Sequence, residues 1–286
     1  MSIQLRTRND GLFAAMEPFL VATAMHRDRF DQRPFGLEIP QANIIDPMRV
    51  DSERFLHLLQ TLDRLTFGPE GMPMPRWVFY DCAELPGGIF GFGRRSEALP
   101  QQIRDALGLE ANESCLVPFS MYVAIPVRPP GAWFGHNLAS LNPVFPALAM
   151  KGLASITKAL ALKVFRCAEQ VGATQWDSDA LHIHSRFGPL DLVTAWTPAH
   201  SESATLTYRF EITDAKLRNA LGDPEVSLRY PATDFEIEAG DEQAMQALQT
   251  RIEAGEQFVV TGPPRRHGRH RRVGVARRTP PASDQS

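Results

Sequence analysis

The chain is poor in cysteine. Its 286 residues include three cysteines, Cys82, Cys115 and Cys167, which lie far apart and form no C-x-x-C pair. A sparse and odd count argues against a disulfide scaffold and against a zinc site built from cysteines. We therefore expect a reduced, cytoplasmic protein.

Long apolar runs are missing as well. No segment approaches the roughly 18 uncharged apolar residues that a membrane-spanning helix needs. The N-terminal run GLFAAMEPFLVATAM is interrupted by Glu17 and Pro18, and no small-residue cleavage pattern follows it. We interpret this run as a docking helix and not as a signal peptide.

Several short catalytic motifs do not occur in the chain. There is no G-x-S-x-G, no P-loop and no H-E-x-x-H, and the glycine-rich GIFGFGRR lacks the third glycine of the dinucleotide fingerprint. These absences argue against the common serine hydrolases, phosphate-cradling enzymes and zinc proteases. No cofactor is expected.

Charge is unevenly distributed. Residues 262–286 hold seven arginines and one acid, a net +6, so a total of -3 leaves about -9 for residues 1–261. An acidic body with a short basic end is not typical of a nucleic-acid-binding domain, and the basic end has no aromatic residue for base stacking. We expect residues 262–286 to be a disordered, arginine-rich tail.

The remaining pattern predicts an α+β protein. Residues 1–50 are expected to form a short helix and an irregular lead-in, and residues 51–261 a single domain. Antiparallel strands, about eight in number, are expected to form a curved or barrel-like sheet with flanking helices. Helices are predicted over residues 51–68, 99–108, 142–156, 214–221 and 241–254. Strands are predicted over residues 76–85, 88–95, 115–127, 132–141, 160–165, 180–187, 190–196, 204–212 and 225–229.

Lys158 lies in the stretch KGLASITKALALKVFRC, which fits two structures. As a helix, the stretch places Lys158 opposite its apolar stripe and in water, where the amine is chemically idle. As a strand from residue 158, it places Lys158 on one face with Leu160 and Leu162. Because the predicted helix from Asn142 is already long, we favour the strand, with Lys158 at the entry to the sheet. Burial there would favour the neutral amine, which can form a Schiff base with a carbonyl compound. An ordinary lysine reaching to water is the alternative.

A second candidate is LHIHSRF. On a strand, His182, His184 and Arg186 project to one face. Two imidazoles on one face could bind a metal, or the three side chains could bind a carboxylate substrate. They could also be the polar outer face of a sheet. Three further residues, Trp133, His136 and Asn137, could line a pocket or serve packing and turns.

The order of features from about residue 117 to 196 resembles the acetoacetate decarboxylase-like superfamily. The segments VPFSMYVAIPV, GAWFGHNLASLN, KGLASITKALALKVF and GATQWDSDALHIHSRFG occur in the family's order. The resemblance implies a curved β-barrel-like sheet, a small-molecule pocket and a Schiff-base lysine at Lys158. Two positions depart from the pattern: Ala159 replaces the second lysine, and Ser120 and Met121 stand where a carboxylate is expected.

These features predict a protein that binds a small carboxylate or oxo compound, and that could act as a Schiff-base lyase or decarboxylase on an oxo acid. Lys158 and His184 are the candidate catalytic residues, and Trp133, His136, Asn137, His182 and Arg186 are the candidate substrate-binding residues. Two alternatives remain: a metal-dependent enzyme using His182 and His184, and a non-catalytic binding protein that has lost the reactive pair. The oligomeric state cannot be predicted.

Overall fold

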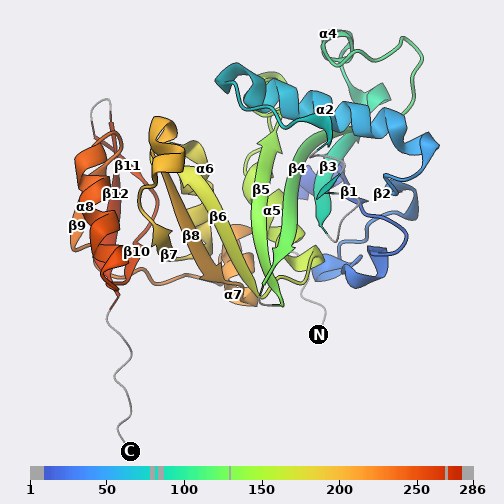
Figure 1. Ribbon diagram of the computed structural model, residues 1–286. Helices are drawn as coiled ribbons and strands as arrows, with labels where there is room; N and C mark the ends of the chain where they lie inside the picture. The colour runs from blue at the N-terminus through green and yellow to red at the C-terminus, as the bar shows by residue number, and fades with distance from the viewer. Residues whose placement is uncertain (1–9, 78–80, 83–86, 129, 268–269, 279–286) are drawn as a thin grey trace, which may run out of the picture. The chain divides into compact units, whose positions relative to one another are not determined.

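A computed structural model describes residues 10–77, 81–82, 87–128, 130–267 and 270–278 (Figure 1). The chain forms two compact units. Unit 1 comprises Met1–Cys167 with Leu221–Asp223, and unit 2 comprises Ala168–Ala220 with Pro224–Ser286. The boundary falls inside the stretch 51–261 that the sequence suggested was one domain. Of the helices in the described ranges, none has the length and apolar character needed to cross a membrane.

Unit 1 is built on a sheet with the strand order β5-β4-β3-β1-β2. Its pairings are antiparallel except for β1 with β2, which is parallel. The β4–β5 pairing has a β-bulge at which β5 carries one extra residue, His136, between the pairs Val123–Asn137 and Ala124–Gly135. The strands are β1 (Glu17–Val21), β2 (Ile44–Ile45), β3 (Gly88–Arg95), β4 (Leu116–Val127) and β5 (Ala132–Ser140).

Two long helices cover opposite faces of this sheet. Thr157 of α5 contacts Ser120 of β4, whereas Asp63 of α2 contacts Asn137, which pairs with Val123 of β4. Ser120 and Val123 are three residues apart in a strand and therefore point to opposite faces. The α-helices of unit 1 that lie wholly within the described residues are α1 (Asp10–Ala15), α2 (Glu53–Phe67), α4 (Gln101–Ala106) and α5 (Leu153–Val164).

The helix predicted over residues 51–68 carries an apolar stripe of Phe55, Leu58, Leu59, Leu62 and Leu65. The first four are buried, as their helical spacing requires, and Leu65 is half-buried. Short 3-10 turns complete the connections of unit 1: η1 (Arg27–Arg29), η2 (Pro34–Gly36), η3 (Gln41–Asn43), η4 (Val50–Ser52), η5 (Gly68–Glu70), η6 (Ser96–Ala98) and η7 (Pro146–Leu148).

Unit 2 has the strand order β11-β12-β10-β7-β8-β6, and β9 pairs with β12. Its pairings are antiparallel. The strands are β6 (Glu169–Gln175), β7 (Leu190–Thr194), β8 (Thr205–Glu211), β9 (Phe235–Glu238), β10 (Phe258–Val260), β11 (Arg265–His267) and β12 (His270–Arg277). The helices are α6 (Asp179–His184), η8 (Ser185–Phe187), η9 (Pro198–Ser203), α7 (Asp214–Ala220) and α8 (Glu242–Glu253).

The α+β class, with a largely antiparallel sheet and flanking helices, is confirmed. The barrel-like closure is wrong, because the strand order is open: the first and last strands of the order do not pair with each other within the described ranges. The strands predicted at 88–95, 115–127, 132–141, 190–196 and 204–212 correspond to β3, β4, β5, β7 and β8. The helices predicted at 51–68, 99–108, 214–221 and 241–254 correspond to α2, α4, α7 and α8.

Other predicted elements are wrong. The helix expected from Asn142 begins at Leu153 instead, because the Asn142 side chain holds the preceding loop by bonding both the N–H and the carbonyl of Met150. The segments 160–165 and 180–187 are helical, and 225–229 is not a strand. Strands β1, β2, β6, β9 and β10 were not expected. The strand predicted over 76–85 lies partly outside the described residues, and its described positions are helical.

The basic end is more ordered than predicted. Residues 265–267 and 270–277 form β11 and β12 instead of a disordered tail, because Val273, Val275 and Ala276 bury apolar side chains there. Four arginines of the basic end also pair with carboxylates: Arg271 with Asp179, Arg272 with Glu236 and Glu238, Arg277 with Glu256, and Arg278 with Asp191. The last part of the predicted tail, residues 279–286, lies outside the described residues.

Candidate site around Lys158

Lys158 lies in the middle of α5. Its helix begins after Gly152, whose φ of 80° is in the left-handed region that glycine tolerates, and it ends before Arg166. The strand interpretation of this stretch is therefore wrong. The alternative interpretation predicted the helix correctly, but it placed Lys158 in water, whereas the residue is 0% exposed. Helix α5 is buried on every side, which leaves no face for a solvated lysine.

The amine of Lys158 lies beside an aromatic ring. Its Nζ lies 5.8 Å from the centre of the Tyr122 ring on β4. Tyr122 pairs in register with Phe90 of β3, and both rings are fully buried. Burial lowers the pKa of Lys158 well below its ordinary value, and the nearby Cys167 thiol opposes this only in part. The free amine is thus the form that this environment favours.

Cys167 lies just beyond the C-terminal end of α5. It is a free cysteine with its backbone N–H bonded to the carbonyl of Leu162. Burial raises the pKa of its thiol far above the ordinary value, and the neighbouring Lys158 opposes this rise. At neutral pH the thiol is uncharged and is not an activated nucleophile.

A pair of hydroxyl groups ties α5 to the sheet beside Lys158. Ser120 Oγ and Thr157 Oγ1 are 2.7 Å apart, and both side chains are fully buried. Ser120 lies two residues from Tyr122 on β4, so both side chains point toward α5. Where the resemblance places a carboxylate, the structure has a neutral hydroxyl that is already hydrogen-bonded.

Trp133 is on the same side of the sheet. Its ring stacks on Phe165 at 5.3 Å with an angle of 18°, and Phe30 packs against Phe165 at 5.4 Å. Phe165 follows Lys158 by seven residues, two helical turns further along the same side of the helix. Of the residues predicted to line a pocket, Trp133 therefore belongs to the same packed layer as Lys158.

His136 and Asn137 belong to a different polar cluster, on the α2 side. The carboxylate of Asp63 accepts hydrogen bonds from Asn137 Nδ2 at 2.8 Å and from the backbone N–H of Met74 at 2.6 Å. The Oδ1 atom of Asn137 is 3.1 Å from His136 Nδ1. Asp63 is 2% exposed, and burial raises its pKa against the opposing effect of these hydrogen bonds. The sheet therefore separates His136 and Asn137 from Lys158.

Asp63 was not predicted, although the sequence contains a signal for it. It follows Leu59 by four residues in α2 and so falls on the apolar stripe of that helix. A carboxylate at such a position is buried and needs hydrogen-bond donors, which Asn137 and the segment after α2 supply.

His182, His184 and Arg186 do not share a face, because they lie on α6 and η8 and not on a strand. Ser178 caps α6 by accepting a hydrogen bond from the N–H of Ala180. Residues two apart in a helix point about 200° apart, so His182 is exposed while His184 is buried. Arg186 is exposed as well. The three residues belong to unit 2, whereas Lys158 belongs to unit 1.

The buried imidazole of His184 packs against an aromatic side chain. Its ring centre lies 5.1 Å from that of Tyr208 on β8. Burial raises the pKa of Tyr208 far above its ordinary value, so its hydroxyl stays protonated. In the searched part of the chain, no group of three or more His, Cys, Asp or Glu side chains is arranged to hold a metal ion. The geometric basis for a metal site at His182 and His184, a shared strand face, is absent.

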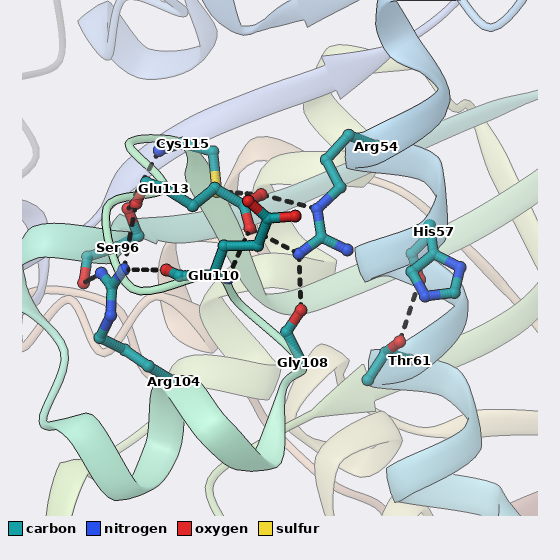
Figure 2. A network of polar contacts seen from close by, with 9 residues as sticks. All are labelled: Arg54, His57, Thr61, Ser96, Arg104, Gly108, Glu110, Glu113 and Cys115. Atoms are coloured by element: carbon teal, nitrogen blue, oxygen red, sulfur yellow. Dashed lines mark hydrogen bonds and ion pairs between the residues drawn. The ribbon is translucent and has the colours of Figure 1, made fainter.

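A polar network that the sequence did not reveal fixes the loop after α4 (Figure 2). Arg54 of α2 forms a bidentate ion pair with Glu113, with N–O distances of 2.6 and 2.7 Å, and also donates to the carbonyl of Gly108. Arg104 of α4 is buried and donates to backbone carbonyls, those of Ser96 at 2.8 Å and Glu110 at 2.7 Å among them. Figure 2 shows both guanidinium groups turned toward this loop. The network holds a loop in place and does not present its donors to a ligand.

Comparison with known proteins gives little further guidance. No family model matches the chain, and no curated protein matches it. Among solved structures, it is similar to the ribosomal-protein-S18-alanine N-acetyltransferase from Escherichia coli, with a TM-score of 0.36 and 10% sequence identity. The match covers 55% of this chain and 88% of that one. At this level of similarity neither the fold nor the activity is transferred to the present chain.

Proposed function

We propose that the protein binds a small carbonyl compound and that Lys158 holds it as a Schiff base. The observation that carries the proposal is the complete burial of the Lys158 amine in α5, beside the ring of Tyr122. A buried amine is favoured in its neutral form, and only the neutral amine has the lone pair needed for attack on a carbonyl carbon.

The reaction is a condensation. The nitrogen lone pair of Lys158 attacks the carbonyl carbon, the two amine protons leave with the carbonyl oxygen as water, and a C=N bond remains. When protonated, such an imine withdraws electrons from the neighbouring carbon, which is how amines of this kind assist the cleavage of an adjacent bond. Because α5 is buried on every side, a ligand reaches the amine only when a neighbouring segment moves.

Reductive trapping tests the proposal. The folded protein is incubated with a panel of aldehydes and ketones, treated with borohydride and analysed by intact mass. Lys158→Met is the informative variant, because an apolar side chain of similar length can replace a buried amine with little loss of packing. Lys163→Ala is the matched control, since Lys163 lies on the same helix, at the edge of the buried region, with its Nζ 5.1 Å from the Phe35 ring.

The expected result is one adduct per chain in the wild type and in Lys163→Ala, and none in Lys158→Met. Adducts that persist in Lys158→Met would show that surface lysines react and would contradict the proposal. Failure of every compound to label Lys158 in the folded protein would also contradict it, and a non-catalytic binding role would then be the function to test.

A further inference from the structure

The surroundings of Lys158 restrict what kind of carbonyl compound can reach it. The side chains that interact with the amine include the Tyr122 ring and the Cys167 thiol, and the Ser120–Thr157 hydroxyl pair joins α5 to the same face of the sheet. All are uncharged at neutral pH, since burial keeps the Cys167 thiol protonated. The position after Lys158, where the resemblance expects a second lysine, is a fully buried alanine.

Burial disfavours a charge on a ligand for the same reason that it disfavours the charged form of the lysine. Bringing a carboxylate beside this amine would remove the carboxylate from water, which is unfavourable unless a cation and further donors replace the lost hydration. The Ser120 and Thr157 hydroxyls are already bonded to each other at 2.7 Å. An uncharged carbonyl group carries no such cost, and an apolar or aromatic body would lie against the buried rings of Tyr122 and Phe90.

A carboxylate on the ligand would also disfavour formation of the Schiff base. A negative charge within a few ångströms favours the ammonium form of a lysine. The oxo acid would thus stabilise the form of Lys158 that cannot attack it, whereas a neutral compound leaves the amine as it is.

We propose that the compound bound at Lys158 is an uncharged, apolar aldehyde or ketone and not an oxo acid. This inference rests on the proposed Schiff-base function and narrows its substrate class. It also removes decarboxylation of an oxo acid from the reactions of this site, because that reaction needs the carboxylate that the site excludes.

A pair of aldehydes that are similar in shape and differ in charge tests the inference. Folded wild-type protein is incubated with para-methylbenzaldehyde or with para-formylbenzoate at the same concentration, reduced with cyanoborohydride and digested, and labelling at Lys158 and Lys163 is measured by peptide mass. The two aldehydes differ in charge at one ring position. Butanone and pyruvate form a second pair of the same design.

The expected result is at least about tenfold more labelling of Lys158 by the neutral member of each pair, a preference of about 1.4 kcal/mol. The preference should be absent when the urea-unfolded protein is labelled with the same pair, and this sample serves as the reference for the reactivity of the two probes. Equal or greater labelling of Lys158 by the anionic member would overturn the inference and leave the Schiff-base function standing. No labelling of Lys158 by either member, with both aldehydes labelling the urea-unfolded protein, would overturn the Schiff-base function and with it the inference.

Discussion

Replacing Glu113 by glutamine tests how much the network of Figure 2 contributes to stability. The hydrogen bonds from Arg54 lower the pKa of Glu113 from 4.5 to about 2. Since one pH unit corresponds to about 1.4 kcal/mol, this difference is worth at most about 3.4 kcal/mol of unfolding free energy. The Glu113 side chain is 17% exposed but that of Arg54 is 39% exposed, so solvent screens the pair. We expect Glu113→Gln to lose about 1–2 kcal/mol at pH 7.

The pH dependence of this loss identifies its cause. A carboxylate whose folded pKa lies below its unfolded pKa stabilises the fold fully above the unfolded value and loses that effect as the pH falls toward the folded value. The gap between wild type and Glu113→Gln should therefore narrow by more than half between pH 7 and pH 3. Urea unfolding at the two pH values measures it.

Glu38→Gln is the matched control for this experiment. Glu38 also pairs with an arginine, Arg33, at 3.1 Å, but the two side chains are 68% and 74% exposed. Exposed pairs of this kind contribute little to stability, so this variant should unfold close to wild type at both pH values. The reasoning would be refuted if Glu38→Gln lost as much unfolding free energy as Glu113→Gln. It would also be refuted if the difference in unfolding free energy between wild type and Glu113→Gln did not change with pH.

Two further predictions concern the buried ionisable groups of unit 1. Burial raises the pKa of Asp63, so the folded state binds this proton more tightly than the unfolded state does, and the free energy of unfolding falls as the pH rises through the carboxyl range. Urea unfolding from pH 4 to pH 7 should therefore show the stability of Asp63→Asn increasing relative to that of wild type as the pH rises. Burial lowers the pKa of Lys158, so the unfolded state binds more protons and the stability of wild type rises with pH. The difference in unfolding free energy by which Lys158→Met exceeds wild type should therefore shrink between pH 7 and pH 10. A difference that does not change with pH would show that Lys158 stays charged in the folded state.

The parts of the fold with clear periodicity could be predicted from the sequence. Helix α2 shows an apolar stripe at helical spacing, and β4 is a continuous run of strand-forming residues, so both were found with nearly correct ends. Such elements bury one face or lie inside a sheet, and their residue pattern reflects that environment directly.

Helix α5 could not be assigned in this way. A helix that is buried on all sides has no polar face, so its sequence carries no period that separates it from a buried strand. Lys158 added to the error, because a charged residue in an apolar run is normally taken to mark an edge or an exposed face. Its burial depends on packing against strand β4, where Tyr122 lies far from Lys158 in the sequence.

The histidine segment failed for a different reason. The alternation in LHIHSRF imitates a strand, but Ser178 followed by Asp179 is an N-terminal capping signal for a helix that begins just there. In the basic end, the arginines hid the alternation of Val273 and Val275, which places both side chains on the buried face of β12. Both segments therefore contain a local signal for the observed structure, but the alternating histidines in one and the many arginines in the other indicated a different structure.

Of the residues predicted for the candidate site, the structure brings only two together. Lys158 and Trp133 lie in one packed layer, whereas His136 and Asn137 lie beyond the sheet with Asp63. A sequence cannot show this division, because it depends on the β4–β5 register and on the bulge at His136.

The division has a consequence for the interpretation of pH effects in this protein. On one side of the sheet, burial of Asp63 makes stability fall as the pH rises; on the other, burial of Lys158 makes it rise. The two contributions have opposite signs, so the pH profile of the wild type alone identifies neither group. Only the difference between wild type and each variant isolates one titration. A carbonyl compound that forms an imine with Lys158 removes a single titrating amine. It should therefore flatten the alkaline limb of the profile and leave the acid limb, to which Asp63 and Glu113 contribute, unchanged.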